Sequence, residues 1–341
     1  MTGENLVQVS GLSRRFDLSQ PWLNRVLSGA PRLTLKAVQE VSFDIRRGET
    51  LALVGESGSG KSTIARMAVG LLPPSGGSVL IDGLDLADRA RKSQLARLRR
   101  RIQMIFQDPY ASLNPRWRVD RIVAEPIRAF GLAASPAETA EKVADLLRRV
   151  GLDPRDGRKF PHEFSGGQRQ RICIARALAS QPEFIVCDEP TSALDVSVQA
   201  QILNLMKDLQ DQLGLTYLFI SHNLAVVRHM ASRIGVVYLG RMVELAPAKS
   251  LFRAPRHPYT RMLLDALPDL EMTGRPRKMV EGEIPSPIDP PPGCAFHPRC
   301  PLANDRCRRE VPQPVLAGDA TVACHAVEEG RAGAALRPGA G

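Results

Sequence analysis

The stretch Gly55-Glu56-Ser57-Gly58-Ser59-Gly60-Lys61-Ser62-Thr63 follows an apolar run, Leu51 to Val54, and precedes a helical pattern from Ile64 to Leu72. A glycine-rich loop between a strand and a helix predicts a phosphate cradle, because glycines let successive N–H groups turn toward one anion. The N-terminal end of the helix adds positive charge. Lys61 is placed to contact β- and γ-phosphates and the Ser62 hydroxyl to hold Mg²⁺, so the loop predicts a nucleoside triphosphate site.

Two further apolar runs end in polar residues that fit such a site. Phe184 to Cys187 is followed by Asp188 and Glu189, and Tyr217 to Ile220 is followed by Ser221-His222-Asn223. Two buried adjacent carboxylates need a cation or a proton, which favours Mg²⁺ near Asp188 and leaves Glu189 to polarise the attacking water. His222 is expected to contact the γ-phosphate or bound water, with a purely structural role as the alternative.

A second glycine pair follows at Phe164-Ser165-Gly166-Gly167-Gln168, before a helical pattern from Arg169 to Ser180. It is either a second anion site at a helix N-terminus or an ordinary serine N-cap. One nucleotide needs one cradle, so two cradles in one chain predict a dimer in which each chain offers its second cradle to its partner's nucleotide.

Composition narrows the class of protein. The chain has 341 residues, is 43% hydrophobic and 24% charged, and lacks an apolar run long enough for a membrane helix. We expect a cytoplasmic protein whose membrane role, if it has one, comes through a partner. The net charge of +10 invites a nucleic-acid interpretation, but the basic run from Arg89 to Arg101 has no aromatic residues for base stacking. A solvated helix face is favoured there, with attraction to an anionic membrane surface as a second possibility.

Strand and helix patterns alternate along most of the chain. Strands are predicted at 6–9, 33–45, 78–81 and 101–106 in addition to the two above, and helices at about 119–150 and 196–213. This order predicts an α/β fold with a largely parallel sheet and a ligand at the carboxyl ends of its strands. The segment from Asp17 to Pro31, with Trp22, Leu23, Val26 and Leu27, is either a short amphipathic insert or a surface loop. From about Glu271 the chain becomes proline-rich, and Glu329 to Gly341 is predicted to be disordered.

At this point the chain resembles the ATP-binding subunits of ABC transporters. Gly55 to Thr63 matches their Walker A motif, Phe164 to Gln168 their signature motif, and Asp188-Glu189 their Walker B motif. Gln107 matches the Q-loop, Ser192-Ala193-Leu194-Asp195 the D-loop, and His222 the switch histidine. The motifs stand in the order of the family and cover about residues 5 to 245.

Three other stretches are similar to the ATPases of dipeptide and oligopeptide importers. They are Gln107-Asp108-Pro109-Tyr110-Ala111-Ser112-Leu113-Asn114-Pro115, His257-Pro258-Tyr259-Thr260 and Pro291-Pro292-Gly293-Cys294-Ala295-Phe296. The first insert and Arg15-Phe16 look most like the second of two paired ATPase subunits. The chain departs from its relatives at Ser59, where many carry Cys, and at Cys187, where Ala is usual.

The resemblance implies an ABC-type ATPase cassette: a RecA-like P-loop core with an antiparallel β subdomain and a helical subdomain at about 108–180. The cassette is expected to occupy residues 1–270. Residues 271–341 are expected to hold a Pro-rich linker, a small C-terminal Cys-containing module and a disordered tail.

The resemblance also implies the mechanism. Two ATPase subunits would sandwich two ATP molecules head to tail, with Gly55 to Thr63 of one subunit facing Ser165, Gly166, Gly167 and Gln168 of the other. Phe16 would stack on adenine, with a buried core position as the alternative. Glu189 would act as general base or water orienter, and Gln107 would sense Mg²⁺ and the membrane subunits. The Mg²⁺ ligands would be Ser62, Gln107 and Asp188. His222 and Asp195 would complete the site.

The implied assembly is a peptide importer at the cytoplasmic face of an inner membrane. Its other members would be a paralogous ATPase or a second copy, two transmembrane permease subunits and an extracytoplasmic peptide-binding protein, without nucleic acid. The rival interpretation is a soluble ABC ATPase acting on nucleic acid or ribosomes. Such proteins commonly carry two cassettes or a coiled-coil insert, and this chain shows neither.

Six cysteines divide into two groups. Cys173 and Cys187 fit buried positions. Cys294, Cys300, Cys307 and Cys324 lie close together, and a cytosolic chain has little use for disulfides, so a metal site is predicted. Their wide spacing lacks the close Cys-x2-Cys pairs typical of zinc. It suits four thiolates around a larger cluster, and some resembling importer ATPases bind a [4Fe–4S] cluster through such a motif. Zinc, with His297 or His325 as substitute ligands, and free thiols are the alternatives.

Overall fold

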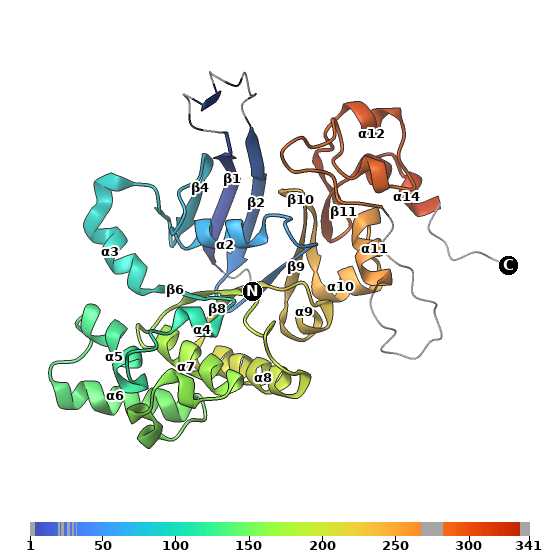
Figure 1. Cartoon of the computed structure of the whole chain (residues 1–341). Helices are drawn as coiled ribbons and strands as arrows, with labels where there is room; N and C mark the ends of the chain where they lie inside the picture. Colours follow the sequence, from blue (N-terminus) through green and yellow to red (C-terminus); the bar gives the residue numbers. More distant parts are fainter. Residues whose placement is uncertain are drawn as a thin grey trace.

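The computed structural model describes residues 4–19, 21, 24–25, 28, 31, 33–266 and 282–334. Its framework is a smaller antiparallel sheet and a larger mixed sheet (Figure 1). The four apolar residues of the expected amphipathic insert and the boundary predicted near residue 270 lie outside the described residues. That boundary therefore stays a prediction. Within the described ranges, every helix is too short or too polar to cross a bilayer.

The antiparallel sheet has the strand order β2-β1-β4-β5 within the described residues. Its strands are β1 (Asn5–Asp17), β2 (Thr34–Arg46), β4 (Gly76–Ile81) and β5 (Leu84–Asp85). β1 continues well beyond the predicted end at Val9, because it pairs with β2 along its length, as far as Asp17 opposite Thr34. A local sequence pattern carries no information about pairing between strands, so the predicted length of β1 was too short.

The mixed sheet places five parallel strands side by side, in the order β9-β3-β8-β7-β6, with antiparallel strands added beyond β9. These elements are β3 (Thr50–Val54), β6 (Ile102–Ile105), β7 (Phe184–Asp188), β8 (Thr216–Ile220), β9 (Arg233–Tyr238), β10 (Arg241–Pro247), β11 (Pro314–Ala317) and β12 (Ala320–Ala323). Every residue of β3, β7 and β8 is buried. Such continuous burial is expected for parallel strands covered on both faces, and the predicted parallel sheet is confirmed.

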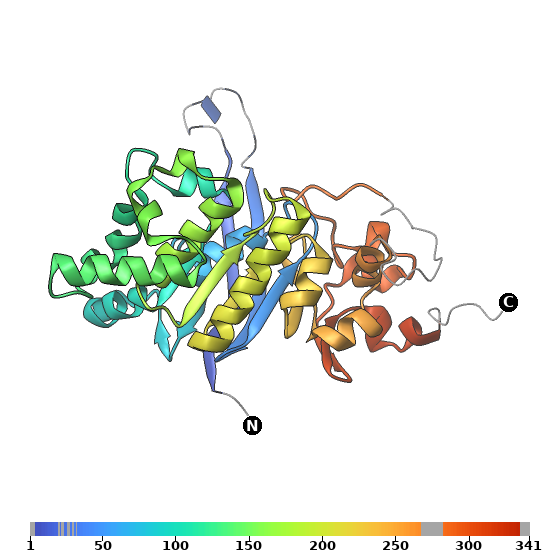
Figure 2. The ribbon, with the colours of Figure 1, turned by 90° about the horizontal axis from the view of Figure 1, so that it is seen from below.

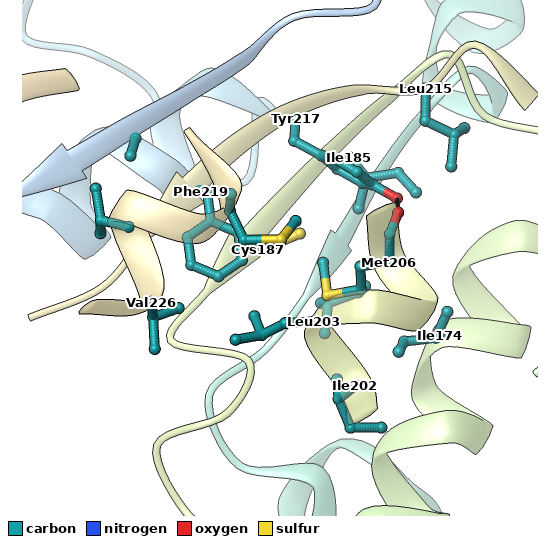
Figure 3. Packing of buried hydrophobic residues seen from close by; sticks show 14 of the residues in the cluster. Ile174, Ile185, Cys187, Ile202, Leu203, Met206, Leu215, Tyr217, Phe219 and Val226 are labelled. Carbon is teal, nitrogen blue, oxygen red and sulfur yellow. Dashed lines mark hydrogen bonds between the residues drawn. The ribbon is translucent and has the colours of Figure 1, made fainter. Parts of the chain in front are cut away.

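Two hydrophobic cores cover the two faces of this sheet. Ile185, Cys187, Tyr217 and Phe219 point into one core, which Figure 3 shows packed against the helix that carries Met206. Their neighbours Phe184, Val186, Leu218 and Ile220 point into the other core, against the antiparallel sheet. Full burial of such side chains stabilises the fold by about 1.5–3 kcal/mol each. The predicted burial of Cys173 and Cys187 is confirmed, at 3% and 0% exposure.

The described chain between β6 and β7 is helical. It contains α4 (Pro109–Ser112), α5 (Val119–Ala129), α6 (Pro136–Arg149), the short turns η2 (Pro154–Arg158) and η3 (Pro161–Glu163), and α7 (Gly166–Leu178). The predicted helical region 119–150 is two helices, because Gly131 takes a φ of 62° and Ser135 caps a new helix that begins at Pro136. Figure 2 shows these helices at one end of the mixed sheet.

Further helices of the described chain flank the sheets. Up to residue 266 they are α2 (Lys61–Ala68), η1 (Arg89–Arg91), α3 (Lys92–Arg100), α8 (Val196–Leu213), α9 (Leu224–Met230), α10 (Ala248–Arg253) and α11 (Pro258–Asp265). The limits of α8 are those predicted. In α3, Leu95 and Leu98 are buried while Lys92, Arg97 and Arg99 are exposed, which confirms the expected solvated face for this helix. Arg101, just beyond it, instead pairs with Asp82 and Glu183.

The C-terminal part lies at the opposite end of the sheet from the helices of residues 109–178 (Figure 2). It contains η4 (His297–Arg299), α12 (Asp305–Arg309), α13 (His325–Glu328) and α14 (Arg331–Ala334) besides β11 and β12. β12 pairs with β10, and Phe296 and Val322 join the core of the mixed sheet. The tail predicted to be disordered from Glu329 contains a turn followed by α14, so that expectation is wrong for its first part. Residues 335–341 lie outside the described residues.

Candidate active site

Four parallel strands deliver their polar residues to one edge of the mixed sheet. β3 leads into the glycine loop, β7 ends at Asp188 and is followed by Glu189, β8 precedes His222, and β6 precedes Gln107. All four segments leave the carboxyl ends of their strands, where the parallel arrangement was expected to place a ligand. The strand order thus brings together segments that are far apart in sequence.

Two glycines of the loop, Gly55 and Gly60, are required by their surroundings. Gly55 has a φ of 151°, and a Cβ at this position would lie 2.2 Å from the Val237 carbonyl oxygen. Gly60, with a φ of 104°, caps α2, and its Cβ would lie 2.4 Å from the Ala37 carbonyl oxygen. Larger residues would move the loop off the sheet. The first N–H groups of α2, which have no partner within the helix, therefore open into the loop.

Lys61 is enclosed by this loop. Its Nζ donates to the carbonyl oxygens of Gly55 (2.8 Å) and Glu56 (2.9 Å) and lies 3.2 Å from Ser59 Oγ. Burial lowers the pKa of Lys61, and the nearby carboxylates of Glu189 and Asp188 oppose the shift. A polyphosphate would add further negative charge beside this ammonium and so stabilise its charged form.

Ser62 and Asp188 form a pair of oxygen ligands. The Ser62 hydroxyl donates to Asp188 Oδ1 at 2.9 Å, and Asp188 is 4% exposed. Burial raises the pKa of the Asp188 carboxyl, which a bound cation would counteract. Mg²⁺ is usually held by one or two protein oxygens together with substrate phosphates. These two residues fit that requirement.

Glu189 is the centre of a second cluster. Gln107 Nε2 donates to Glu189 Oε2 at 2.9 Å, and His222 Nδ1 lies 2.9 Å from Glu189 Oε1. Glu189 has a φ of 48°, a strained value for a residue with a side chain, and such strain often marks functional positions. The structure therefore brings together Gln107, Glu189 and His222, which the sequence could only align by motif.

The second glycine cradle begins α7. Ser165 is its N-cap: Gln168 N donates to Ser165 Oγ at 3.3 Å, and Ser165 N donates to Gln168 Oε1 at 3.0 Å. Ser165 therefore caps α7, Ser165 and Gln168 stay exposed, and the role of this cradle as an anion site stays a prediction. α7 belongs to the core on one face of the mixed sheet, and α2 to the core on the other face. The cradle and the phosphate loop of one chain therefore begin helices on opposite faces.

Two other predicted residues flank the site. Phe16 is half-buried, so the alternative of a core position is wrong, and the guanidinium of Arg14 lies 4.7 Å from the centre of its ring. Phe16 pairs with Leu35, close to the strand segment that contacts Gly60. Asp195 is exposed at the N-cap of α8 and makes no side-chain capping bond. The adenine contact of Phe16 and the role of Asp195 stay predictions.

The four C-terminal cysteines are free thiols. Burial raises the pKa of Cys294 to about 12 and of Cys300 to about 11, and in both cases the other cysteines of the group add to the shift. Cys294 N donates to the Cys307 carbonyl oxygen at 2.8 Å, so these two cysteines are neighbours in the structure. The described residues nevertheless contain no group of three or more His, Cys, Asp or Glu side chains arranged to hold a metal ion. The predicted iron–sulfur site is not confirmed.

The predicted substitute ligands make other contacts. His297 Nδ1 lies 3.0 Å from the Cys294 carbonyl oxygen, and His325 Nε2 lies 3.0 Å from the Glu310 carbonyl oxygen. Both rings thus have protein partners in this arrangement.

Sequence reasoning missed two residues that contact the phosphate loop. Arg299 forms an ion pair with Glu56, and the hydroxyl of Tyr259 accepts a hydrogen bond from Glu56 N. Tyr259 lies in the stretch His257-Pro258-Tyr259-Thr260, which resembles importer ATPases but does not by itself indicate a role for the tyrosine. Nothing local in the sequence marks Arg299.

Comparison with protein families gives two matches. Residues 38–192 match the family described as ABC transporter, and residues 243–307 match the family described as oligopeptide/dipeptide transporter, C-terminal region. The first match contains the phosphate loop and Glu189. The second contains Tyr259, Arg299 and three of the four C-terminal cysteines.

Curated relatives and solved structures agree with these matches. The chain is 48% identical to the di/tripeptide transport ATP-binding protein DppF of Pseudomonas aeruginosa, over 96% of this chain and 99% of the relative. It is 50% identical to the oligopeptide transport ATP-binding protein AppF of Bacillus subtilis, over 85% and 89%. A dimeric ATP-binding cassette in a post-hydrolysis state with ADP and Pi matches with a TM-score of 0.61 and 28% identity, over 71% and 98%.

Proposed function

The chain belongs to the ATP-binding proteins of ABC transporters that carry the oligopeptide/dipeptide transporter C-terminal region, and from this premise we propose that it hydrolyses ATP to power peptide import. One observation carries the catalytic part: Gln107, Glu189 and His222 are hydrogen-bonded together beside the Ser62–Asp188 pair and the Lys61 loop. The peptide substrate is supported by the C-terminal family match and the names of the relatives.

The proposed chemistry assigns each side chain a task. Lys61 and the loop N–H groups neutralise and orient the phosphates, while Ser62 and Asp188 would hold Mg²⁺. The bound cation would supply charge stabilisation at the transferred phosphoryl group. Glu189 would orient the attacking water and accept its proton, with His222 and Gln107 fixing its two carboxylate oxygens. Catalysis is then mostly positioning and electrostatics.

We also propose that the working unit is a dimer. α2 and α7 pack on opposite faces of the sheet, so the Ser165–Gln168 cradle is badly placed to serve the phosphate loop of its own chain. Head-to-tail pairing would place each cradle on the partner's nucleotide. ATP would close this dimer and hydrolysis would reopen it, because the γ-phosphate is the ligand shared across the interface. The partner is a paralogue or a second copy.

The importer proposal is tested by isolating the assembly through a tag on this chain. We expect two permease subunits and an ATPase partner to co-purify with it from membranes, with this chain bound at their cytoplasmic face. The reconstituted complex should take up peptides when an extracytoplasmic binding protein is present. A Lys61→Ala complex is the control and should assemble without transporting. Co-purification of ribosomes or nucleic acid without permeases would contradict the proposal.

For the C-terminal cysteines we propose a four-thiolate metal site, with a [4Fe–4S] cluster favoured over zinc. Its support is the wide spacing of Cys294, Cys300, Cys307 and Cys324 within one short C-terminal stretch, together with the hydrogen bond of 2.8 Å from Cys294 N to the Cys307 carbonyl oxygen. The thiols would have to reorient, since the described arrangement is not yet a metal site. No step of hydrolysis depends on this group.

Metal analysis of the full chain tests this site. Protein purified without oxygen should carry about four iron and four sulfide ions, and Cys307→Ser should lose them. Cys173→Ser is the matched control, because Cys173 is a buried thiol in α7, far in sequence from the four C-terminal cysteines. This substitution should leave the iron content unchanged. Protein without iron and without broad visible absorbance would remove the cluster, and zinc alone would favour the alternative.

A further inference from the structure

The C-terminal part of the chain contacts the phosphate loop through an ion pair made by an arginine. Arg299 Nη1 lies 2.8 Å from Glu56 Oε2, and Nη2 lies 3.0 Å from Glu56 Oε1. This is a two-pronged ion pair, and the Arg299 side chain is only 2% exposed, against 19% for Glu56. Paired, parallel hydrogen bonds of this kind are among the strongest and most directional in proteins. Glu56 is the second residue of the phosphate loop. Its carboxylate is bound by Arg299, a residue that lies outside the nucleotide-binding motifs.

A tyrosine hydroxyl accepts a hydrogen bond from the backbone N–H of the same residue, Glu56. Glu56 N donates to the Tyr259 hydroxyl at 2.9 Å, and Tyr259 is fully buried in α11. Its ring lies 4.6 Å from that of Tyr238 and 5.4 Å from that of Phe296, which is three residues before Arg299. Arg299 also reaches the Tyr238 hydroxyl at 3.4 Å. An aromatic cluster therefore fixes both groups that hold Glu56.

The ion pair between Arg299 and Glu56 affects the charge that a bound phosphate group meets in the loop. The loop must hold a polyanion, and Glu56 brings a carboxylate into it. The carbonyl oxygen of the same residue already accepts a bond from Lys61 Nζ at 2.9 Å. Without a counter-charge, the Glu56 carboxylate would repel the phosphates and compete with them for the Lys61 ammonium. The Arg299 guanidinium removes that repulsion.

We propose that Arg299 is a positioning residue for the nucleotide, which neutralises Glu56 and thereby couples the C-terminal part of the chain to ATP affinity. This rests on the ATP binding proposed above. Arg299 is the last residue of η4, so a rearrangement of this turn moves the guanidinium relative to the loop. The neighbouring Cys300 makes the turn part of the cysteine cluster.

The test measures the dissociation constant of the full chain for a fluorescent ATP analogue with Mg²⁺. Arg299→Ala should weaken binding about tenfold or more, raise the KM for ATP more than it lowers kcat, and do so most at low salt. Arg306→Ala is the matched control. Arg306 lies in α12 and pairs with Glu310, Glu328 and Glu329, and its loss should leave the dissociation constant unchanged.

A second change separates charge from mere packing. If the unpaired carboxylate causes the loss, Arg299→Ala combined with Glu56→Gln should bind the analogue more tightly than Arg299→Ala alone. If Arg299 only props up the fold, the double variant should be no better. Melting temperatures are measured for each, and Arg299→Gln, which keeps a donor and loses the charge, replaces Arg299→Ala should the latter unfold.

Two outcomes would overturn the proposal: an unchanged dissociation constant in a folded Arg299 variant, or no recovery in the double variant. Failure of the wild-type chain to bind the analogue would instead contradict the proposed function, so the two failures are distinguishable.

Discussion

Replacing Glu189 with glutamine is expected to slow ATP turnover by about 100- to 10,000-fold, the usual range for loss of a general base. Glutamine has the same shape and keeps an oxygen to pair with Gln107 or His222, both 2.9 Å from the carboxylate in the wild type. It cannot accept the proton of the attacking water. Phosphate release measures the loss, and nucleotide binding by Lys61 and the loop should survive.

The control for this change is Glu141→Gln. Glu141 lies on the exposed side of α6 and also loses a negative charge, so it tests whether net charge alone matters. We expect wild-type turnover from it. Near-normal hydrolysis by the Glu189 variant would contradict the general-base role, and loss of ATP binding would show that Glu189 instead supports the loop.

The sequence identified the parts of this site that are continuous in the chain. The phosphate loop, the Asp188–Glu189 pair and the Ser165 cap each combine a local pattern with a local physical cause: glycine backbone freedom, a buried strand end and a helix N-terminus. The parallel sheet then followed from the alternation of strands and helices. The helix α8, with apolar residues at helical spacing between clear ends, was predicted to the residue.

Contacts across the chain were beyond that reasoning. Arg299 and Glu56 are 243 positions apart, and no periodicity links them. The strands β11 and β12 were missed because β12 gains its hydrogen bonds from β10 and β11 gains them from β12, and their own short sequences are weak signals. The separation of α2 and α7 on opposite sheet faces also depends on packing, and it supplies the physical reason to expect a shared site.

If the Ser165–Gln168 cradle of one chain completes the nucleotide site of its partner, blocking this cradle should stop turnover. Ser165→Arg should lower turnover about 100-fold, comparable to the loss of a group that stabilises transition-state charge, while the chain still binds ATP through its own loop. Ser165 is exposed, so a long side chain is tolerated by the isolated chain but would block the partner's nucleotide. The change also removes a cap from α7, at a cost of about 1 kcal/mol. Buried residues such as Ile172 and Ala175 keep the helix in place.

Ser135→Arg is the matched control, because Ser135 caps α6 in the same way, accepting a hydrogen bond from Glu138 N at 3.1 Å. Both variants lose a serine cap and gain a positive charge, but only Ser165 begins the helix proposed to face the partner. We expect Ser135→Arg to hydrolyse ATP at the wild-type rate. Equal turnover in the two variants would mean that one chain completes the site alone, and the dimer would then serve transport without serving catalysis.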